Sequence, residues 1–299
     1  MLYDCVIIGG GPSGLNAALV LGRAKKNVLL FDEDKPRNAV TYESHGFITR
    51  DRIKPSEFKQ IAKEELKRYP NITIHHERVI DISKERHFIA IHTNNGQLYR
   101  SRKVILSTGL TDVLPDIEGI HNYYGKSLFS CPFCDGWELK DLPLLVISED
   151  ERAFHMTKMI SNWSSNLVVC TNGKSLFSIE QKELITNKNI TIMEEEIETF
   201  LGQDGLLQKV RFKNGKEITR QGGFVTTGLR QASTLPEKLG CAMNKMGGIE
   251  VDSFGRTNIE GVYACGDNTM QVPAQLIIAA ADGSKTAAAV VGDFVQEEF

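Results

Sequence analysis

Short, uninterrupted hydrophobic runs alternate with amphipathic stretches along most of the chain. Near the N-terminus, Cys5–Ile8 and Val28–Phe31 are continuous rather than alternating runs, which is typical of strands buried on both faces of a sheet. Between them, the apolar residues of Leu15–Ala24 recur at helical spacing. The pattern therefore predicts a strand–helix–strand unit with a parallel sheet at the start of the chain.

The next region predicts one helix and several short strands. Residues 53 to 68 are amphipathic, with lysine and glutamate on the outer face, as in a helix that covers a sheet. Strands are expected at Ile72–Ile74, Phe88–His92, Leu98–Tyr99 and Lys103–Leu106.

A second α/β segment begins near Pro115. Its buried strands Leu144–Ile147 and Leu167–Val169 flank a helix from about Arg152 to Trp163. Later strands are expected at Ile190–Met193, Val210–Phe212, 223–228 and Val262–Ala264, before a final alanine-rich helix over about Gln275–Val295. The pattern as a whole predicts the α/β fold class.

Composition and charge narrow the possible classes of protein. At roughly 150 residues per domain, 299 residues suggest about two domains. A hydrophobic fraction of 41% is ample for a core, and a net charge of −3 provides no basic field for nucleic acid. The chain contains no apolar run long enough to span a membrane, and its first residues lack the basic region of a signal peptide. We therefore expect a cytoplasmic protein without nucleic-acid or membrane partners.

A glycine-rich turn follows the first strand. Residues 9 to 14, Gly-Gly-Gly-Pro-Ser-Gly, fit the pattern Gly-x-Gly-x-x-Gly. Gly9 permits the tight turn, Gly11 lets the backbone approach a pyrophosphate, and Gly14 lets the helix pack on the strand. Asp32 ends the second strand, where it can accept hydrogen bonds from an adenosine ribose. With strand, helix and acid in register, the turn predicts a dinucleotide site.

Two later segments favour FAD over NAD(P) at this site. Asp267 follows a buried strand, as does the aspartate that holds the ribityl chain in flavoproteins with two dinucleotide folds. The final helix begins near Gln275 and Leu276, where its N-terminus would favour negative charge on a reduced flavin. Residues 107 to 109, Ser-Thr-Gly, are the third match, closing the sheet beside the cofactor.

The only cysteine spacing that implies chemistry is the pair Cys131 and Cys134. Two cysteines three residues apart at the start of a helix can form and reopen a disulfide. The alternatives are half of a zinc site or two buried thiols. A zinc site needs a second pair of ligands, and the remaining cysteines do not make one, so no metal is expected. Cys5 and Cys265 are expected to be core residues.

These motifs together resemble the low-molecular-weight thioredoxin reductase family of FAD disulfide oxidoreductases. The resemblance implies two Rossmann-like domains: an FAD domain formed by residues 1–113 and 232–299, and an inserted pyridine-nucleotide-type domain, 114–231, that carries the cysteines. It also implies that Cys134 lies nearer the flavin, that Cys131 exchanges with the substrate, and that Asp135 is the acid. The implied cofactor-binding residues are Gly9, Gly11, Pro12, Ser13, Gly14, Asp32, Asn38, His45, Val79, Thr108, Gly109, Gly266, Asp267, Gln275 and Leu276.

The inserted domain departs from the family pattern. After its first strand, residues 148 to 153 read Ser-Glu-Asp-Glu-Arg-Ala, with no glycine and with three acids that would repel a pyrophosphate. The basic cluster for a 2′-phosphate is also missing from residues 170 to 174. We therefore expect no productive NADPH binding. The segments at Arg37-Asn38, His45–Phe47, Pro132-Phe133 and 171–173 resemble a branch of gliotoxin- and holomycin-type dithiol oxidases, although that branch tends to carry histidine at the position of Asp135.

The sequence thus predicts a flavoenzyme that interconverts a dithiol and a disulfide. The expected substrate is a small dithiol or disulfide, or a thioredoxin-like protein, and the family resemblance implies a homodimer. Three alternatives stay open: an NADPH-dependent thioredoxin reductase, a reductase fed by ferredoxin, and a flavin-bearing redox sensor. The sequence does not fix the direction of electron flow.

Overall fold

The computed structural model describes residues 1–270 and 273–299, which divide into two compact units. The first unit comprises 1–39, 46–111 and 230–299, and the second comprises 40–45 and 112–229. The predicted domain boundaries at 113/114 and 231/232 each lie two residues beyond these crossing points. Residues 40–45 differ from the prediction, because they group with the second unit although both flanking segments belong to the first.

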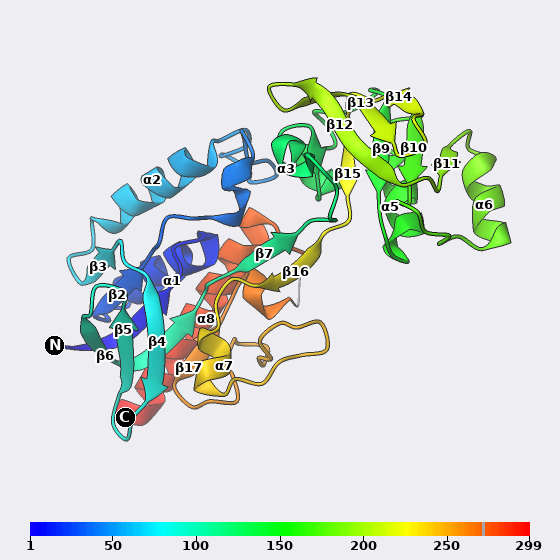
Figure 1. Ribbon diagram of the computed structural model, residues 1–299. Coiled ribbons are helices and arrows are strands. Elements are labelled where there is room, and N and C mark those ends of the chain that lie inside the picture. Colours follow the sequence, from blue (N-terminus) through cyan, green and yellow to red (C-terminus); the bar gives the residue numbers. More distant parts are fainter. Residues whose placement is uncertain (271–272) are drawn as a thin grey trace. The chain divides into compact units, whose positions relative to one another are not determined.

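The first unit is built on a seven-stranded sheet with the order β3-β2-β1-β6-β5-β4, in which β17 also pairs with β6 (Figure 1). Strands β1, β2, β3, β6 and β17 are parallel, whereas β4 and β5 are antiparallel additions at one edge. The strands are β1 (Leu2–Ile8), β2 (Val28–Phe31), β3 (Ile72–His75), β4 (Val79–Lys84), β5 (Ile89–Thr93), β6 (Leu98–Leu106) and β17 (Val262–Ala264). The helices are α1 (Pro12–Arg23), α2 (Pro55–Leu66), α7 (Leu235–Leu239) and α8 (Leu276–Glu298), with the short 3-10 helices η1 (Arg37–Val40) and η2 (Asp267–Thr269).

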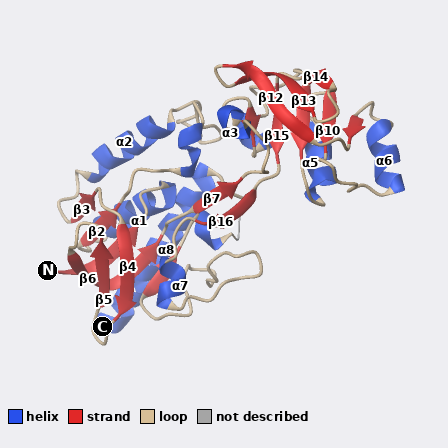
Figure 2. Ribbon diagram, viewed as in Figure 1, coloured by secondary structure: helices blue, strands red, loops and turns tan. Residues whose placement is uncertain are grey.

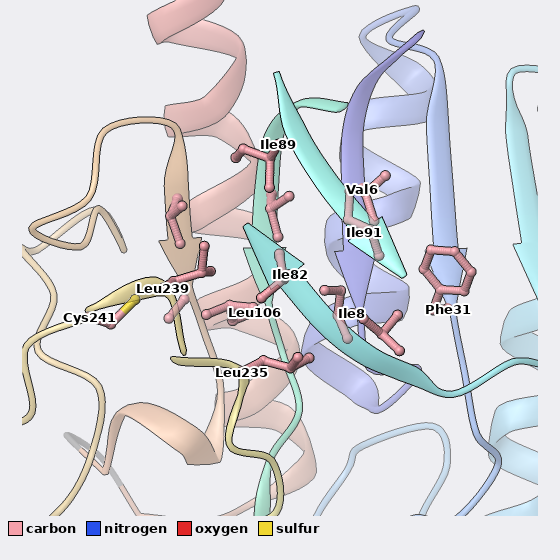
Figure 3. Close-up of a cluster of buried hydrophobic side chains, with 14 of the residues drawn as sticks. Val6, Ile8, Phe31, Ile82, Ile89, Ile91, Leu106, Leu235, Leu239 and Cys241 are labelled. Atoms are coloured by element: carbon pink, nitrogen blue, oxygen red, sulfur yellow. The ribbon is translucent and has the colours of Figure 1, made fainter. Parts of the chain in front are cut away.

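Two hydrophobic clusters form the core of this unit. One combines Val6, Ile8 and Phe31 of the parallel strands with residues of β4 and β5 and with Leu235 and Leu239 of α7 (Figure 3). The other combines the remaining residues of β1 and β2 with α1 and α8. Adjacent strand residues such as Val6 and Ile7 enter different clusters, as expected for a sheet that is buried on both faces.

The second unit has its own five-stranded parallel sheet with the order β11-β10-β9-β15-β8, and a separate antiparallel sheet β12-β13-β14 (Figure 2). Its strands are β8 (Leu128–Phe129), β9 (Leu144–Ile147), β10 (Leu167–Cys170), β11 (Thr191–Met193), β12 (Ile197–Gln203), β13 (Leu206–Phe212), β14 (Glu217–Thr219) and β15 (Gly222–Val225). Its helices are α3 (Ile120–Tyr123), α4 (Pro132–Asp135), α5 (Arg152–Ile160) and α6 (Ile179–Thr186). The chain changes units within β7 (Leu110–Val113) and within β16 (Gly228–Gln231), and these two strands pair.

The fold confirms the predicted α/β class, with two differences in the first sheet. Strand β4 was not predicted, and a single strand replaces two predicted ones. The segments Leu98–Tyr99 and Lys103–Leu106, predicted as two strands, form the single strand β6. Its first half pairs antiparallel with β5, and its second half pairs with β17, while β1 lies along most of its length. The polar residues Arg100 and Arg102, which interrupt the hydrophobic pattern, are more exposed than the buried residues between and after them. In the described parts of the chain, no helix combines the length and apolar character needed to cross a membrane.

Candidate functional site

The glycine loop between β1 and α1 is shaped by close backbone contacts. A Cβ on Gly9, whose φ is +114°, would lie 2.1 Å from the carbonyl oxygen of Ser107. A Cβ on Gly14 would lie 1.9 Å from the carbonyl oxygen of Gly9. A Cβ on Gly11, by contrast, would meet no protein atom within 4 Å, and Gly11 is the N-cap of α1. The space in front of Gly11 therefore fits a pyrophosphate that approaches the backbone at a helix N-terminus.

Three loops meet at the carboxyl ends of β1, β6 and β17. The Ser107 hydroxyl donates a hydrogen bond to the Gly9 carbonyl at 2.8 Å. The Asn268 side-chain amide donates to the Leu106 carbonyl at 2.9 Å, and its nitrogen lies 3.5 Å from the Thr108 hydroxyl. Since parallel strands end at the same sheet edge, residues that are far apart in sequence are brought to one place. This part of the site unites the glycine loop, residues 107–109 and Gly266-Asp267, as the sequence indicated.

Two further segments predicted to contact a flavin are the one around Asn38 and the start of α8. The carboxylate of Asp267 forms an ion pair with the Arg37 guanidinium at 3.1 Å, which ties η2 to η1, the short helix that also contains Asn38. Gln275 is the N-cap of α8 and Leu276 is the first residue of that helix.

Asp32, the predicted ribose acceptor, is almost fully buried at the end of β2 and is paired with two lysines. Its carboxylate oxygens lie 3.0 Å from the Lys59 ammonium and 2.8 Å from the Lys63 ammonium. The backbone N–H of Asp34 also donates to Asp32, at 3.0 Å. The Asp34 carboxylate pairs with Lys59 at 2.5 Å, and the lysine hydrogen bond is the main reason why the pKa of Asp34 is lowered.

Neither lysine was predicted as a site residue, although the sequence contains a signal for one of them. In α2, the buried residues Pro55, Lys59 and Leu66 lie at positions i, i+4 and i+11 of the inward face. A lysine on such a face needs an acidic partner, because an isolated charge is too costly to bury. Its position therefore indicates a buried ion pair, although it does not identify the partner.

Val79 and His45 were predicted to contact the cofactor. Val79 begins β4 and is buried in the cluster that contains Ile8 and Phe31. His45 belongs to the segment that groups with the second unit, where its Nε2 lies 3.7 Å from the Glu138 carboxylate. Thus the structure brings His45 together with the turn after the cysteine pair.

Cys131 and Cys134 form a disulfide at the start of α4. Cys131 is the N-cap residue and Cys134 lies in the first turn, so that their Cα atoms are 5.3 Å apart. The backbone N–H groups of Cys134 and Asp135 both lie 3.2 Å from the Cys131 carbonyl oxygen, to which they donate. This turn is the local structure that brings the two sulfur atoms into bonding range.

Asp135 follows Cys134 directly and is 9% exposed. Burial, and next the charge of Glu138, raise the pKa of the Asp135 carboxyl to about 7. A carboxyl with this pKa is partly protonated near neutral pH, so it can donate a proton to a neighbouring thiolate and take one back.

The other four cysteines are buried and are not part of a disulfide. Burial raises the pKa of the thiols of Cys5 and Cys265 strongly, and raises that of Cys170 to about 12. Buried thiols with raised pKa values are inert, so the redox-capable cysteines are Cys131 and Cys134. No cluster of metal-ligating side chains occurs within residues 1–270 and 273–299.

The turn after β9 is the counterpart in the second unit of the glycine loop, and it is held by its own acidic side chains. The Asp150 carboxylate accepts hydrogen bonds from the Arg152 backbone N–H at 3.0 Å and from the Arg152 guanidinium at 2.9 and 2.6 Å. Glu149 accepts one from the Asn172 side chain at 2.5 Å, and its backbone carbonyl accepts one from Lys174 at 3.1 Å. The turn therefore contains carboxylates, with their own partners, where a second dinucleotide would need a glycine-rich phosphate loop.

The two units define a class of protein: a two-domain dinucleotide-fold protein with a redox disulfide in its second domain. Comparison with known proteins agrees. Residues 3–283 match the family described as pyridine nucleotide-disulphide oxidoreductase. The crystal structure of a candidate thioredoxin reductase, TrxB, from Bacillus anthracis has 46% sequence identity and a TM-score of 0.96, and the match covers 99% of this chain and 100% of that one.

Two further relatives are similar over nearly their whole length. The crystal structure of an oxidoreductase from Agrobacterium tumefaciens has 32% identity and a TM-score of 0.92, with 99% of each chain covered. Thioredoxin reductase aclD from Aspergillus oryzae is 28% identical, over 99% of this chain and 98% of the relative. The chain belongs to the pyridine nucleotide-disulphide oxidoreductase family and is a thioredoxin reductase-like disulfide oxidoreductase, for which the family implies a flavin cofactor.

Proposed function

We propose that the protein is an FAD-dependent thiol–disulfide oxidoreductase that works without NADPH. It moves two electrons between a dithiol or disulfide substrate and FAD through Cys131 and Cys134. The observation that carries the proposal is the contrast between the two turns: the first leaves open space at Gly11, whereas the second presents Glu149 and Asp150.

In this proposal the first unit holds FAD. The glycine loop binds the pyrophosphate through the N-terminus of α1, and Asp32 orients the ribose. Asp267 holds the ribityl chain, while the N-terminus of α8 at Gln275 and Leu276 favours negative charge at the flavin. When bound, the flavin would accept or donate two electrons. The chain's own residues bind the flavin and carry out the thiol–disulfide exchange.

With a dithiol substrate, the exchange at the disulfide takes place in two steps. A substrate thiolate attacks the Cys131 sulfur, the Cys131–Cys134 bond breaks, and Cys134 leaves as a thiolate that takes a proton from Asp135. The second substrate thiol returns a proton to Asp135 and attacks the mixed disulfide, which releases Cys131 as a thiolate. The substrate is thereby oxidised to a disulfide by two electrons, the cysteine pair is reduced by two electrons, and one proton passes to solvent.

The substrate proposed for this exchange is a small dithiol or disulfide, or a thioredoxin-like protein. The cysteine turn supports either, because Phe133 and Trp137 beside it are largely exposed in the second unit. The predicted homodimer and the predicted cytoplasmic compartment stay predictions from the sequence and the family resemblance.

An NADPH-dependent thioredoxin reductase is the second candidate, favoured by the name of the relative aclD. The ion-paired turn at Asp150 opposes it, because the carboxylates of that turn would repel the pyrophosphate of NADPH. A ferredoxin-fed reductase is separated from it by the compound that reduces the flavin. A redox sensor is separated from both by a lack of steady-state turnover with any dithiol or electron donor.

Substitution of Cys134 by serine tests the proposed route of the electrons. Cys134→Ser is expected to abolish dithiol-dependent reduction of the flavin in the holoenzyme, because a lone Cys131 thiol provides no disulfide that a substrate dithiol can reduce. The buried thiol of Cys241 provides a control, and Cys241→Ala is expected to retain turnover. Full turnover in Cys134→Ser would contradict the assignment.

A further inference from the structure

Asp282 is the first charged residue of α8, after the six apolar residues that open the helix. Aspartate is a poor helix former, because its short side chain competes for backbone hydrogen bonds. Its side chain is also only 16% exposed. A largely buried carboxylate in the interior of a helix needs a polar partner, and a partner on another element would tie that element to α8.

That partner is the backbone of Gly266, the residue before Asp267. The Gly266 N–H donates a hydrogen bond to the Asp282 carboxylate at 2.7 Å. The Gly266 carbonyl accepts hydrogen bonds from the Thr269 N–H at 3.1 Å and from the Thr269 hydroxyl at 2.9 Å. Gly266 has a φ of +82°, a conformation that favours glycine. Because both of its backbone polar groups are bonded, the turn that carries Asp267 is fixed by protein atoms alone.

The residue next to Asp282 packs on the glycine loop. A Cβ on Gly283 would lie 2.0 Å from the carbonyl oxygen of Ser13, which is part of the Gly-x-Gly-x-x-Gly pattern. A Cβ on Gly266 would lie 2.5 Å from the hydroxyl oxygen of the same serine. The start of α1, the turn before Asp267 and α8 therefore meet around Asp282, and all three belong to the first unit.

Asp282 has a second partner that does not connect elements. Its Oδ1 lies 2.7 Å from the Lys285 ammonium, one turn later in α8, and the lysine side chain is 45% exposed. An exposed pair within one helix contributes little to stability. The hydrogen bond from Gly266 goes to the other carboxylate oxygen, Oδ2. The two partners can therefore be removed separately by substitution.

We propose that Asp282 is a positioning residue for the flavin, because it holds the Gly266 backbone and thereby fixes Asp267 before the cofactor binds. This inference rests on the proposed binding of FAD by the first unit, and it adds a residue that acts only through the turn. The Arg37 guanidinium pairs with the Asp267 carboxylate at 3.1 Å, whereas Asp282 holds the backbone that precedes it. A turn that is ordered in advance loses less conformational entropy when the ligand binds, so the affinity for FAD is higher.

The test compares FAD affinity, measured by fluorescence titration of the apoprotein, in three variants. Asp282→Ala removes the acceptor and is expected to weaken FAD binding by about tenfold. Asp282→Asn keeps an acceptor oxygen for the Gly266 N–H and is expected to stay within about threefold of the parent. Lys285→Gln, the matched control, removes only the exposed pair and is expected to stay within about twofold. Unchanged affinity in Asp282→Ala would overturn the proposal, as would equal losses in all three variants.

A double-mutant cycle shows whether Asp282 acts through Asp267. Asp282→Ala is expected to weaken FAD binding by less than about twofold when Asp267 is already alanine, because the positioned group is then absent. A residue that only stabilises the fold would cause the same loss in both backgrounds. An equal loss of about tenfold in both would therefore contradict the proposed role.

A second measurement needs no variant. Because Asp282 accepts the Gly266 N–H without help from the flavin, this amide is expected to exchange with solvent at least about 100-fold more slowly than an unprotected amide in the parent apoprotein. NMR-detected hydrogen exchange measures this rate, and exchange at the unprotected rate would overturn the inference. Absence of flavin bleaching by dithiothreitol, by contrast, would contradict the proposed function without changing either the FAD affinities or this exchange rate.

Discussion

Two residues of the glycine loop are glycine for different reasons. Gly14 is constrained by the protein itself, because any Cβ there would overlap the Gly9 carbonyl oxygen at 1.9 Å. Gly11 is not constrained by any protein atom within 4 Å of the place where its Cβ would be. A glycine that the fold does not require indicates a close approach by something outside the chain.

The paired alanine variants separate folding from cofactor binding. Gly11→Ala is expected to change the free energy of unfolding of the apoprotein by less than about 0.5 kcal/mol, and to weaken flavin binding at least about tenfold. Gly14→Ala is expected to destabilise the apoprotein by about 2 kcal/mol, because the added carbon forces the loop apart. Denaturant titration of the apoprotein and fluorescence titration with FAD measure the two effects. Unchanged FAD affinity in Gly11→Ala would contradict the assignment of the loop.

At the residue scale, the sequence predicted the parts of the site that are encoded locally. The Cys131–Cys134 spacing and the glycine loop are short motifs whose geometry is set by a single turn, and the structure shows the disulfide and the loop accordingly. The partner of Lys59 and the contact between His45 and Glu138 depend on which elements meet in space. No short-range pattern contains that information, so they could not be identified from the sequence alone.

Helix α2 is attached to the sheet through a buried ion pair. Lys59, on its inward face, is 6% exposed and lies 3.0 Å from the Asp32 carboxylate at the end of β2. Lys63, one turn later, lies 2.8 Å from the same carboxylate. Lys67, the C-cap residue just after α2, is exposed and pairs with Glu64 in the last turn of the helix. The two lysines Lys59 and Lys67 thus provide a buried and an exposed ion pair for comparison.

Substitution of each lysine by methionine compares the two pairs. Lys59→Met is expected to lower the free energy of unfolding by about 2–3 kcal/mol, because it removes one partner of a buried carboxylate while Lys63 remains. Lys67→Met is expected to change it by less than about 1 kcal/mol, as for other exposed pairs. Denaturant titration of both variants measures the difference. Equal, small effects would show that the Asp32 pair does not hold α2 in place.

At the element scale, hydrophobic patterning predicted the buried strands well, since Cys5–Ile8 of β1 and all of β2, β9, β10 and β17 are continuous apolar runs. It did not predict β4 (Val79–Lys84), because only two of the residues in this strand are buried and the others are polar or exposed. It also missed α7, which has only five residues. Edge strands and single-turn helices are stabilised mainly by what they pack against, so their own sequence contains a weak signal.

The whole molecule combines two units, each with a sheet of parallel central strands, and the units differ at the turn after a central buried strand. In the first unit this turn is Gly9–Gly14, and in the second it is 148–151, where Asp150 pairs with Arg152 at 2.6 Å. The second unit retains the parallel strand order around β9 and β15 and a hydrophobic cluster on each face. The packing of such a unit can stay the same while the turn differs, because the core and the turn are stabilised by different residues.

In the proposed function, electrons reach the flavin from thiols and not from NADPH. An anaerobic titration of the holoenzyme with NADPH, NADH, dithiothreitol and reduced ferredoxin, followed by flavin absorbance, distinguishes these donors. Dithiothreitol is expected to bleach the flavin at the stoichiometry of a two-electron donor, and NADPH and NADH are expected to leave it oxidised. Rapid bleaching by NADPH would contradict the account and identify an NADPH-dependent reductase, whereas bleaching by reduced ferredoxin alone would identify a ferredoxin-fed reductase.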